Sequence, residues 1–278
     1  MRDKKHLSLC WGSLDGVAFD DFLEAAASAG FDAVTLNSAF YIEARTAGIS
    51  DEDFARRVRD SGLYVSDIDP LFNWLPGVTA LPGDDAISLC TQASMDDVFE
   101  LAHLVGTDLV NAPLGFATPE SEQQIVDGFA ALCEHAQQQG LRVSLEFMPF
   151  NQISNLETAA RIVKQAACSN GGIMFDCWHH HRGGGVAEDI LAVPGEHFFA
   201  FQLDDALAQP MADVLEETLN HRALPGEGCI DLHQILKNFD AVGAELVVDV
   251  EVFNEALRSL TTTQRAEKLY SASRAIIE

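Results

Sequence analysis

The chain has 278 residues, 47% of them hydrophobic, which is enough apolar material for one large α/β domain. Its 43 acidic and 17 basic residues give a formal net charge of −26. A surface of that sign repels phosphate backbones and anionic lipid, so neither nucleic acid nor a membrane is an expected partner.

Short β-rich segments alternate with longer amphipathic segments along the chain. The predicted strands are, in order, His6–Cys10, Ala33–Leu36, Tyr64–Asp69, Leu109–Leu114, Arg142–Met148, Ile173–Cys177, Phe199–Leu203 and Leu246–Phe253. The predicted helices include Asp20–Ala29, Ser50–Ser61, Pro119–Gln139, Asn155–Cys168, Val186–Val193, Asp231–Ala241 and Thr261–Ile277. Glycines stand where several helices should end before a strand, at Gly30, Gly62, Gly106, Gly140 and Gly243.

The strand–helix alternation predicts parallel strands joined by right-handed crossovers. Eight such units in this length fit a closed (β/α)₈ TIM barrel, and we expect residues 1–278 to form this single domain. A doubly wound open sheet is the rival architecture. Against it, neither G-x-G-x-x-G nor G-x-x-x-x-G-K-[ST] follows any predicted strand.

Oxygen-bearing side chains interrupt the last four predicted strands near their carboxyl ends, although parallel strands are normally apolar on both faces. In a barrel these ends meet at one mouth, where carboxylates repel one another unless a cation or an arginine compensates them. Taken singly, each acid could be a hydrogen-bonded structural group. As a set without thiolate or imidazole, they favour one hard divalent ion, Mn²⁺ or Mg²⁺, over Zn²⁺. The set is Glu146, Asp176, Gln202 and Glu251, and Asp249 is also expected to point into the barrel.

Three further side chains are candidates for the mouth. His179 lies just past the sixth predicted strand and could exchange a proton with a substrate oxygen. Arg222 precedes a rigid Pro-Gly turn and could bind a substrate hydroxyl or carboxylate, or else lie on the surface. Trp11 could form an apolar wall against a ring, or belong to the core. His180 and His181 are expected in an ordinary polar turn.

At these residues the sequence resembles the xylose-isomerase-like TIM-barrel superfamily, which includes sugar phosphate isomerases and epimerases. The matching segments are Leu145–Pro149, Phe175–His179, Gln202–Ala206, Arg222–Gly228 and Val250–Phe253. The resemblance implies that Glu146, Asp176, Gln202 and Glu251 hold a metal. Epimerases of the family usually have His at the third position, whereas Gln occurs there in some 3-dehydroshikimate dehydratases. An apurinic endonuclease branch needs extra histidine ligands and a cationic groove, which this acidic chain fits poorly.

The chemistry shared by the isomerases, epimerases and dehydratases is removal of a proton next to a carbonyl. The first hypothesis is an isomerase or epimerase of a small sugar, keto-sugar or cyclitol, with Glu146 and Glu251 as base and acid on the two substrate faces. The second is a lyase of 3-dehydroshikimate or keto-sugar type, in which His179 carries the proton. A third is a non-catalytic sugar-binding or partner subunit. Metal-free glycoside hydrolysis by paired carboxylates is a further alternative.

The expected partner is a small polyhydroxylated carbonyl compound, and the sequence leaves the oligomeric state open, a homo-oligomer included. The six cysteines are scattered without a C-x-x-C pair, and no signal peptide or membrane span is visible. Reduced, mostly buried thiols and a cytoplasmic location are therefore expected.

Overall fold

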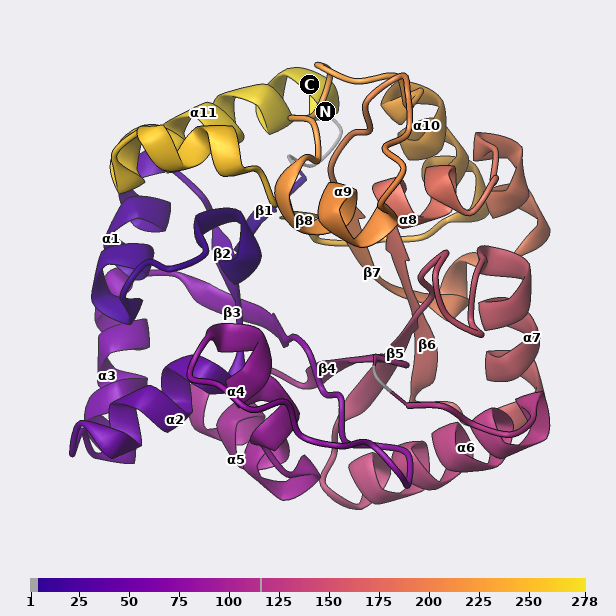
Figure 1. The fold of residues 1–278 in the computed structure, drawn as a ribbon, viewed down its shortest axis with the longest axis horizontal. Coiled ribbons are helices and arrows are strands. Elements are labelled where there is room, and N and C mark those ends of the chain that lie inside the picture. Colours follow the sequence, from indigo (N-terminus) through magenta and orange to yellow (C-terminus); the bar gives the residue numbers. More distant parts are fainter. Residues whose placement is uncertain (1–4, 116) are drawn as a thin grey trace.

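The computed structural model describes residues 5–115 and 117–278, and in it eight parallel strands close into a barrel in the order β1 to β8 (Figure 1). The strands are β1 (Leu7–Cys10), β2 (Ala33–Leu36), β3 (Tyr64–Ile68), β4 (Leu109–Pro113), β5 (Arg142–Glu146), β6 (Gly171–Asp176), β7 (Phe198–Leu203) and β8 (Val248–Val250). Pairing of β1 with β8 completes the ring, with Ser8 opposite Asp249. The predicted (β/α)₈ barrel is confirmed, and the open sheet is excluded.

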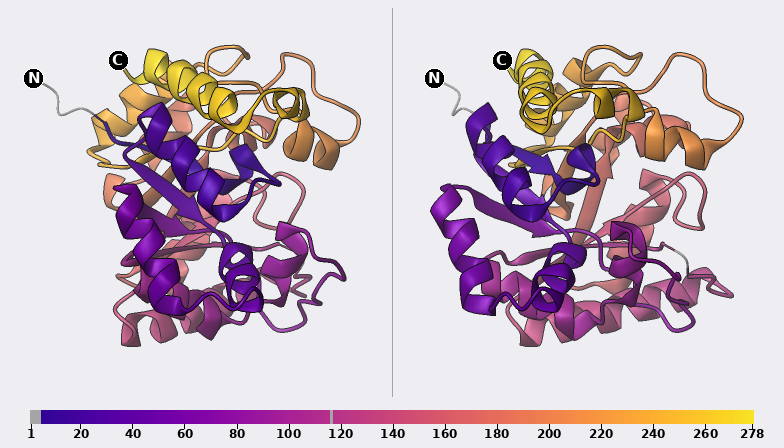
Figure 2. Two further views of the ribbon diagram at one scale, coloured as in Figure 1. Left: turned by 90° about the vertical axis from the view of Figure 1, so that its left-hand side faces the viewer. Right: turned by 60° about the vertical axis from the view of Figure 1, so that its left-hand side comes forward.

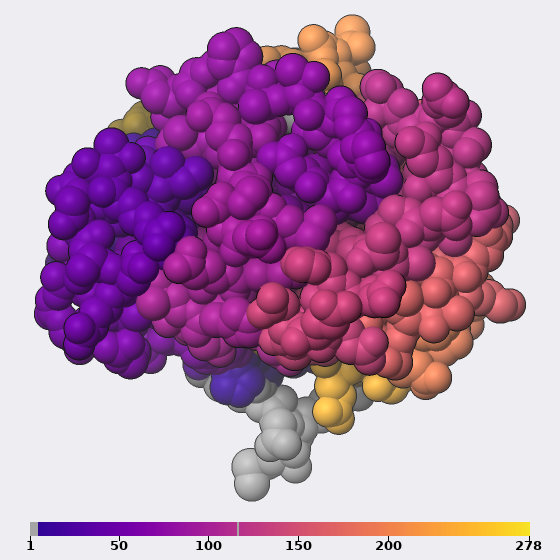
Figure 3. All heavy atoms as spheres, turned by 90° about the horizontal axis from the view of Figure 1, so that it is seen from below, coloured from indigo at the N-terminus to yellow at the C-terminus, as the bar shows by residue number. Residues whose placement is uncertain are grey.

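Helices form a shell outside the strands. The α-helices are α1 (Phe19–Ala29), α2 (Ser38–Thr46), α3 (Asp51–Ser61), α4 (Ala86–Gln92), α5 (Met95–Val105), α6 (Glu122–Gln138), α7 (Leu156–Ala166), α8 (Cys177–Arg182), α9 (Val214–Asn220), α10 (Leu232–Val242) and α11 (Thr262–Ile277). Short 3₁₀ helices are η1 (Trp11–Leu14), η2 (Ala187–Ala192), η3 (Gly195–His197) and η4 (Glu255–Ser259). Figure 3, seen from below, shows the purple-to-pink part of the molecular surface.

Two long connections stand at the same end of the barrel. They are the purple connection after β3 and the orange connection after β7, which project together in the left view of Figure 2. Strands in this fold are parallel, so this end gathers the carboxyl ends of all eight. It is the mouth at which the sequence predicted a site.

The core lies between the strands and the helical shell and is made of apolar side chains such as Phe22, Phe129, Phe175 and Phe239, all buried. The six cysteines are free thiols, four of them buried, as expected. No helix in the described part of the chain is both long and apolar enough to cross a bilayer.

The segment predicted as an α-helix over Val186–Val193 forms the 3₁₀ helix η2 instead, so that prediction is wrong in type. Pro194 follows it directly, and the residue before a proline is displaced from the helical region; Val193 is accordingly extended. The side chain of Asp189 also accepts a hydrogen bond from the Val186 backbone N–H at 2.8 Å, which favours the tighter turn.

Strand β8 spans only Val248–Val250 and is therefore shorter than the predicted strand Leu246–Phe253. Beyond it, the backbone N–H of Val252 donates to the hydroxyl of Ser13 at 2.7 Å instead of to a neighbouring strand. Likewise, the turn expected at His180 and His181 is the short helix α8, which begins because the Asp176 carboxylate caps it at the His179 N–H.

The five glycines predicted at helix ends all have positive φ. Gly243, which ends α10, has φ 75° and free space where a Cβ would stand. Ala167 ends α7 in the same left-handed conformation, with φ 53°. Both helix ends therefore adopt the left-handed backbone conformation. Glycine at position 243 adopts it at little cost, whereas alanine at position 167 is strained by it.

We predict opposite effects for Gly243→Ala and Ala167→Gly. Left-handed backbone costs a non-glycine residue about 1 kcal/mol, so Gly243→Ala should lower the free energy of unfolding by about that amount and Ala167→Gly should raise it by up to as much. Denaturant titration of both variants checks this. Changes of the same sign would refute the argument.

Candidate active site

The four oxygen-bearing residues predicted from the last four strands lie together, buried, at the mouth. Gln202 Nε2 donates to Glu251 Oε1 at 3.2 Å, and Asp176 and Glu251 accept hydrogen bonds from one common donor, Arg222. Glu146 is joined to this group through His179, whose Nε2 is 3.5 Å from Glu146 Oε1. The inward orientation predicted from strand alternation is therefore what the structure shows.

The guanidinium of Arg222 lies at the centre of these acids. Its Nη1 is 2.7 Å from Asp176 Oδ2, 2.5 Å from Asp204 Oδ2 and 2.9 Å from Glu251 Oε2. Nη2 and Nε donate to the hydroxyl and the carbonyl of Thr218, at 2.9 and 3.0 Å. The aromatic rings of two neighbouring residues also face the guanidinium at 5.4 and 5.5 Å, those of Trp178 and Phe253.

Arg222 reaches this position because the connection after β7 is anchored. Its backbone N–H donates to the Phe253 carbonyl at 3.0 Å, and the next residue, Ala223, exchanges backbone hydrogen bonds with Asp205. The Asp205 carboxylate in turn accepts from the backbone N–H groups of Gly226 and Gly228. The rigid turn predicted here is thus built around a single buried carboxylate. The predicted substrate-binding role of Arg222 stays a prediction, since its N–H groups are directed at protein atoms.

His179 stands in the first turn of α8 with its ring between Glu146 and Arg222. The side chain is buried, and its Nδ1 has no hydrogen-bond partner among the described residues. Burial lowers the pKa of this imidazole to about 4, so the ring is neutral at pH 7. A neutral imidazole with a free nitrogen can accept a proton.

Burial dominates the ionisation of the acids. It raises the pKa of Glu146 well above its usual value, with Glu251 adding to the shift, and it raises the pKa of Glu251 to about 7 against the opposing effect of Arg222. Asp176 is the exception: burial alone would raise its pKa, but Arg222 beside it lowers the pKa below its usual value. One guanidinium therefore does not compensate all the carboxyl groups gathered here.

The residues present fit a divalent cation. Gln202 Oε1 is buried and has no hydrogen-bond partner in the described structure, which leaves an oxygen available as a ligand. In each of two groups at the mouth, the possible ligand atoms lie within 4.8 Å of one another: one group is Glu146, Asp176 and His179, and the other is Cys10, Asp69 and Glu251. A bound cation would offset the carboxylates that Arg222 leaves uncompensated.

Sequence reasoning missed three polar residues of the mouth: Asp69, Asn111 and Asp204. Asp69 accepts from Gln202 Nε2 at 3.2 Å, and Asn111 Nδ2 donates to Asp69 and Glu146 at 2.8 and 2.7 Å. Asp69 and Asp204 each stand at the carboxyl end of a predicted strand, so the rule applied to β5–β8 would have selected both.

Trp11 lies just past β1 at the mouth, with its ring edge-on to Phe253 at 5.8 Å between centroids. It lines two neighbouring cavities, one over the acids and one beside them. Its indole N–H has no hydrogen-bond partner among the described residues. The structure therefore places Trp11 both in the core and on the wall of the predicted site.

The sequence profile described as xylose isomerase-like TIM barrel matches residues 23–277. The chain belongs to this family. The family assignment agrees with the barrel and with the resemblance noted from the sequence, so both are confirmed.

The relatives include two kinds of enzyme. A 3-dehydroshikimate dehydratase of Pseudomonas putida is 30% identical over 267 residues, covering 93% of this chain and 40% of that protein. An inosose isomerase of Bacillus subtilis is 29% identical over 147 residues, covering 52% of each chain. A solved structure of the IolI protein with a bound zinc atom superposes with a TM-score of 0.83, at 21% identity, over 99% of this chain and 98% of that one. The chain thus spans less than half the length of the dehydratase it matches.

We predict that Arg222→Gln lowers the free energy of unfolding by about 3–5 kcal/mol when a chelator is present, because it leaves buried carboxylates without their counter-charge. Arg161→Gln is the control: it removes a half-exposed pair with Glu122, worth about 1 kcal/mol or less. Denaturant titration measures both. Equal losses would contradict the role assigned to Arg222.

Proposed function

We propose that this chain is a metal-dependent lyase that removes a proton next to the carbonyl of a small cyclic hydroxy-ketone and expels a neighbouring hydroxyl as water. The proposal refines the metal-dependent proton abstraction expected from the sequence, and it prefers the lyase to the isomerase or epimerase. The observation that supports it is a difference between two candidate proton carriers at the mouth. His179 has a ring nitrogen without a protein partner, whereas both carboxylate oxygens of Glu251 accept hydrogen bonds from protein donors.

Both carboxylate oxygens of Glu251 are already occupied by protein donors in this arrangement. Its Oε1 accepts from Cys10 Sγ and Gln202 Nε2, both at 3.2 Å, and its Oε2 accepts from Arg222 Nη1. His179, in contrast, lines the cavity with one ring nitrogen free of protein partners. A single base without a protein partner, on one side of the substrate, suits an elimination. In such a reaction the same group can take the proton and return it to the leaving hydroxyl.

The metal ligands we propose are Glu146, Asp176, Gln202 and Glu251. When bound there, a divalent ion would polarise the substrate carbonyl and stabilise the negative charge that develops on its oxygen. The oxygen donors favour Mn²⁺ or Mg²⁺, although the IolI structure holds zinc. Arg222 would keep Asp176 ionised and would hold both Asp176 and Glu251 in position for the ion.

The chain's own residues then handle the proton. His179 takes the proton from the carbon next to the carbonyl, and the carbon–hydrogen electrons pass onto the carbonyl oxygen. They return to form the new carbon–carbon double bond as the hydroxyl on the adjacent carbon departs. The protonated ring donates to that hydroxyl, so water leaves and His179 returns to its neutral form. Glu146, 3.5 Å from Nε2, would stabilise the transient positive charge on the ring.

The comparisons favour the same choice. The match to the dehydratase covers 93% of this chain, whereas the match to the inosose isomerase covers 52%. Gln202 also stands at the position where the epimerases usually carry histidine.

The isomerase or epimerase is the second candidate, because Glu146 and Glu251 both line the cavity that His179 faces. An epimerase needs acid–base groups on both faces of the substrate, and these two residues could supply them. Such an enzyme would exchange a substrate hydrogen with solvent without forming a double bond. A binding subunit without turnover would do neither.

We predict that Mn²⁺ stabilises the protein against unfolding by about 2.7 kcal/mol at roughly 100 times its Kd. Gln202→Leu should weaken Mn²⁺ binding by more than about tenfold, whereas Gln202→His, which keeps a ligand, should retain binding. Asp249→Asn is the control, since Asp249 stands two residues before Glu251 on β8 and is not among the proposed ligands. Calorimetric titration with Mn²⁺, Mg²⁺ and Zn²⁺ gives the Kd values. An unchanged Kd in Gln202→Leu would remove Gln202 from the ligand set.

We predict that His179→Asn reduces turnover by about 10²–10⁴-fold while Mn²⁺ binding is retained, because the proton carrier is lost. His181→Asn, on the same short helix but outside the cavity, should keep wild-type turnover. The assay follows absorbance of a conjugated double bond and deuterium uptake from solvent, over cyclic hydroxy-ketones that include 3-dehydroshikimate and inosose. Deuterium uptake without a new double bond would replace the lyase by the isomerase or epimerase.

A further inference from the structure

The cavity over the acids has a polar floor and apolar walls. Its volume is about 220 Å³, and the floor is made of Asp69, Glu146, His179, Arg222 and Glu251. Most of the remaining lining is apolar, including Trp11, Phe72, Met148, Phe150, Leu219 and Phe253. Polar groups are therefore concentrated where a carbonyl would be held, and few are offered to the rest of a bound molecule.

The apolar lining continues onto the rim, where it is exposed. Helix α9 presents Leu215 and Leu219, one turn apart, and they are 50% and 44% exposed. Phe150, on the connection after β5, is 38% exposed. Large apolar side chains exposed at the entrance of a cavity are typical of a surface that contacts a ligand or another protein.

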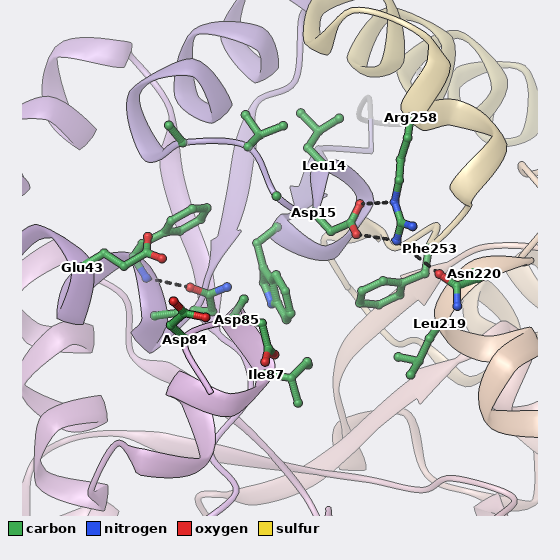
Figure 4. Close-up of a pocket in the computed structure, with 18 residues that line it drawn as sticks. Leu14, Asp15, Glu43, Asp84, Asp85, Ile87, Leu219, Asn220, Phe253 and Arg258 are labelled. Carbon is green, nitrogen blue, oxygen red and sulfur yellow. Dashed lines mark hydrogen bonds and ion pairs between the residues drawn. The ribbon is translucent and has the colours of Figure 1, made fainter. Parts of the chain in front are cut away.

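A second, larger cavity of about 660 Å³ adjoins the first. Four residues line both cavities, and we call them the shared wall: Trp11, Ile87, Leu219 and Phe253. In Figure 4 the acidic side chains of Glu43 and Asp84 stand on one side of this second cavity, and the Asp15–Arg258 ion pair stands on the other.

The shared wall is held in place by close packing. A Cβ on Gly12 would stand 2.2 Å from the Phe253 ring, so the ring lies directly against the glycine backbone. Phe253 also packs edge-on against Trp11. The wall is thus a fixed apolar surface that reaches from above the acids into the second cavity.

A polyhydroxylated ring fits such walls poorly. Each hydroxyl that leaves water without finding a hydrogen-bond partner opposes binding, and the walls of the first cavity, above its polar floor, offer few partners. The second cavity offers further room, but charged and polar side chains such as Glu43, Asp84 and Arg258 line much of it, so only the shared wall continues the apolar surface there. Apolar surface removed from water, in contrast, favours binding in proportion to its area.

We propose that the substrate is a cyclic ketone with an extended hydrocarbon body and few hydroxyl groups. Its carbonyl meets the polar floor, and its hydrocarbon part lies along the shared wall and under Leu215 and Phe150. This inference rests on the proposed function for the chemistry at the floor. It departs from the sugar-like substrates expected from the sequence.

The first test measures binding to the Mn²⁺-loaded protein by calorimetry. The probes are cyclohexanone, its methyl, ethyl and propyl derivatives, and a fully hydroxylated cyclohexanone. Each added methylene should tighten binding by about threefold to fourfold, the effect of burying one CH₂ group. The fully hydroxylated ring should bind more weakly than the propyl derivative. Equal or tighter binding of the hydroxylated ring would overturn the proposal.

The second test uses variants of the rim. Leu215→Asn should weaken the propyl derivative by about fivefold, with little effect on cyclohexanone itself. Leu191→Asn is the matched control, because Leu191 is 51% exposed but lines neither cavity. Unchanged affinity in Leu215→Asn, together with a changed sedimentation coefficient, would assign the rim to a protein interface instead and overturn the proposal.

Binding and turnover separate the two proposals. Tight binding of the alkyl ketones without deuterium uptake from any ketone would refute the proposed function and support the substrate class. Double-bond formation from the hydroxylated ring, with no gain from alkyl substitution, would support the function and overturn the substrate class.

Discussion

The buried guanidinium of Arg222 is the interaction on which the mouth of the barrel depends. Closing eight parallel strands brings the carboxyl end of every strand to one place, so Asp176, Asp204 and Glu251 must share a small volume with little water. Their mutual repulsion and lost hydration would oppose folding. A single nitrogen of Arg222 contacts all three carboxylates, and this contact makes the arrangement compatible with a folded chain.

The position of the Arg222 guanidinium depends on the connection after β7. The Asp205 carboxylate accepts hydrogen bonds from the backbone at Gly226 and Gly228 and fixes the turn that follows Arg222. The same connection includes α9, which carries Leu215 on the rim. One anchored loop therefore sets both the electrostatics of the floor and the apolar character of the entrance.

The cavity over the acids combines a polar floor with apolar walls, and these walls affect the electrostatics at the floor. Apolar residues such as Phe72 and Phe253 around the acids keep the local dielectric low, which under the proposed function would strengthen the attraction between a bound cation and a developing negative oxygen. The same burial keeps His179 neutral and able to accept a proton. If the proposed function holds, the apolar wall would contribute to both catalysis and substrate selection.

The sequence by itself determined the barrel and the inward faces of its strands, because strand–helix alternation and a side-chain period of two are local properties. Glu146 and Glu251 could be selected in this way. Local patterns also produced the errors, such as a helix predicted where Pro194 forces a tighter turn. Only the tertiary structure decided that Asp69 meets Gln202, 133 positions away in the chain. Contacts of that kind depend on barrel closure and on where loops return, and no local spacing encodes them.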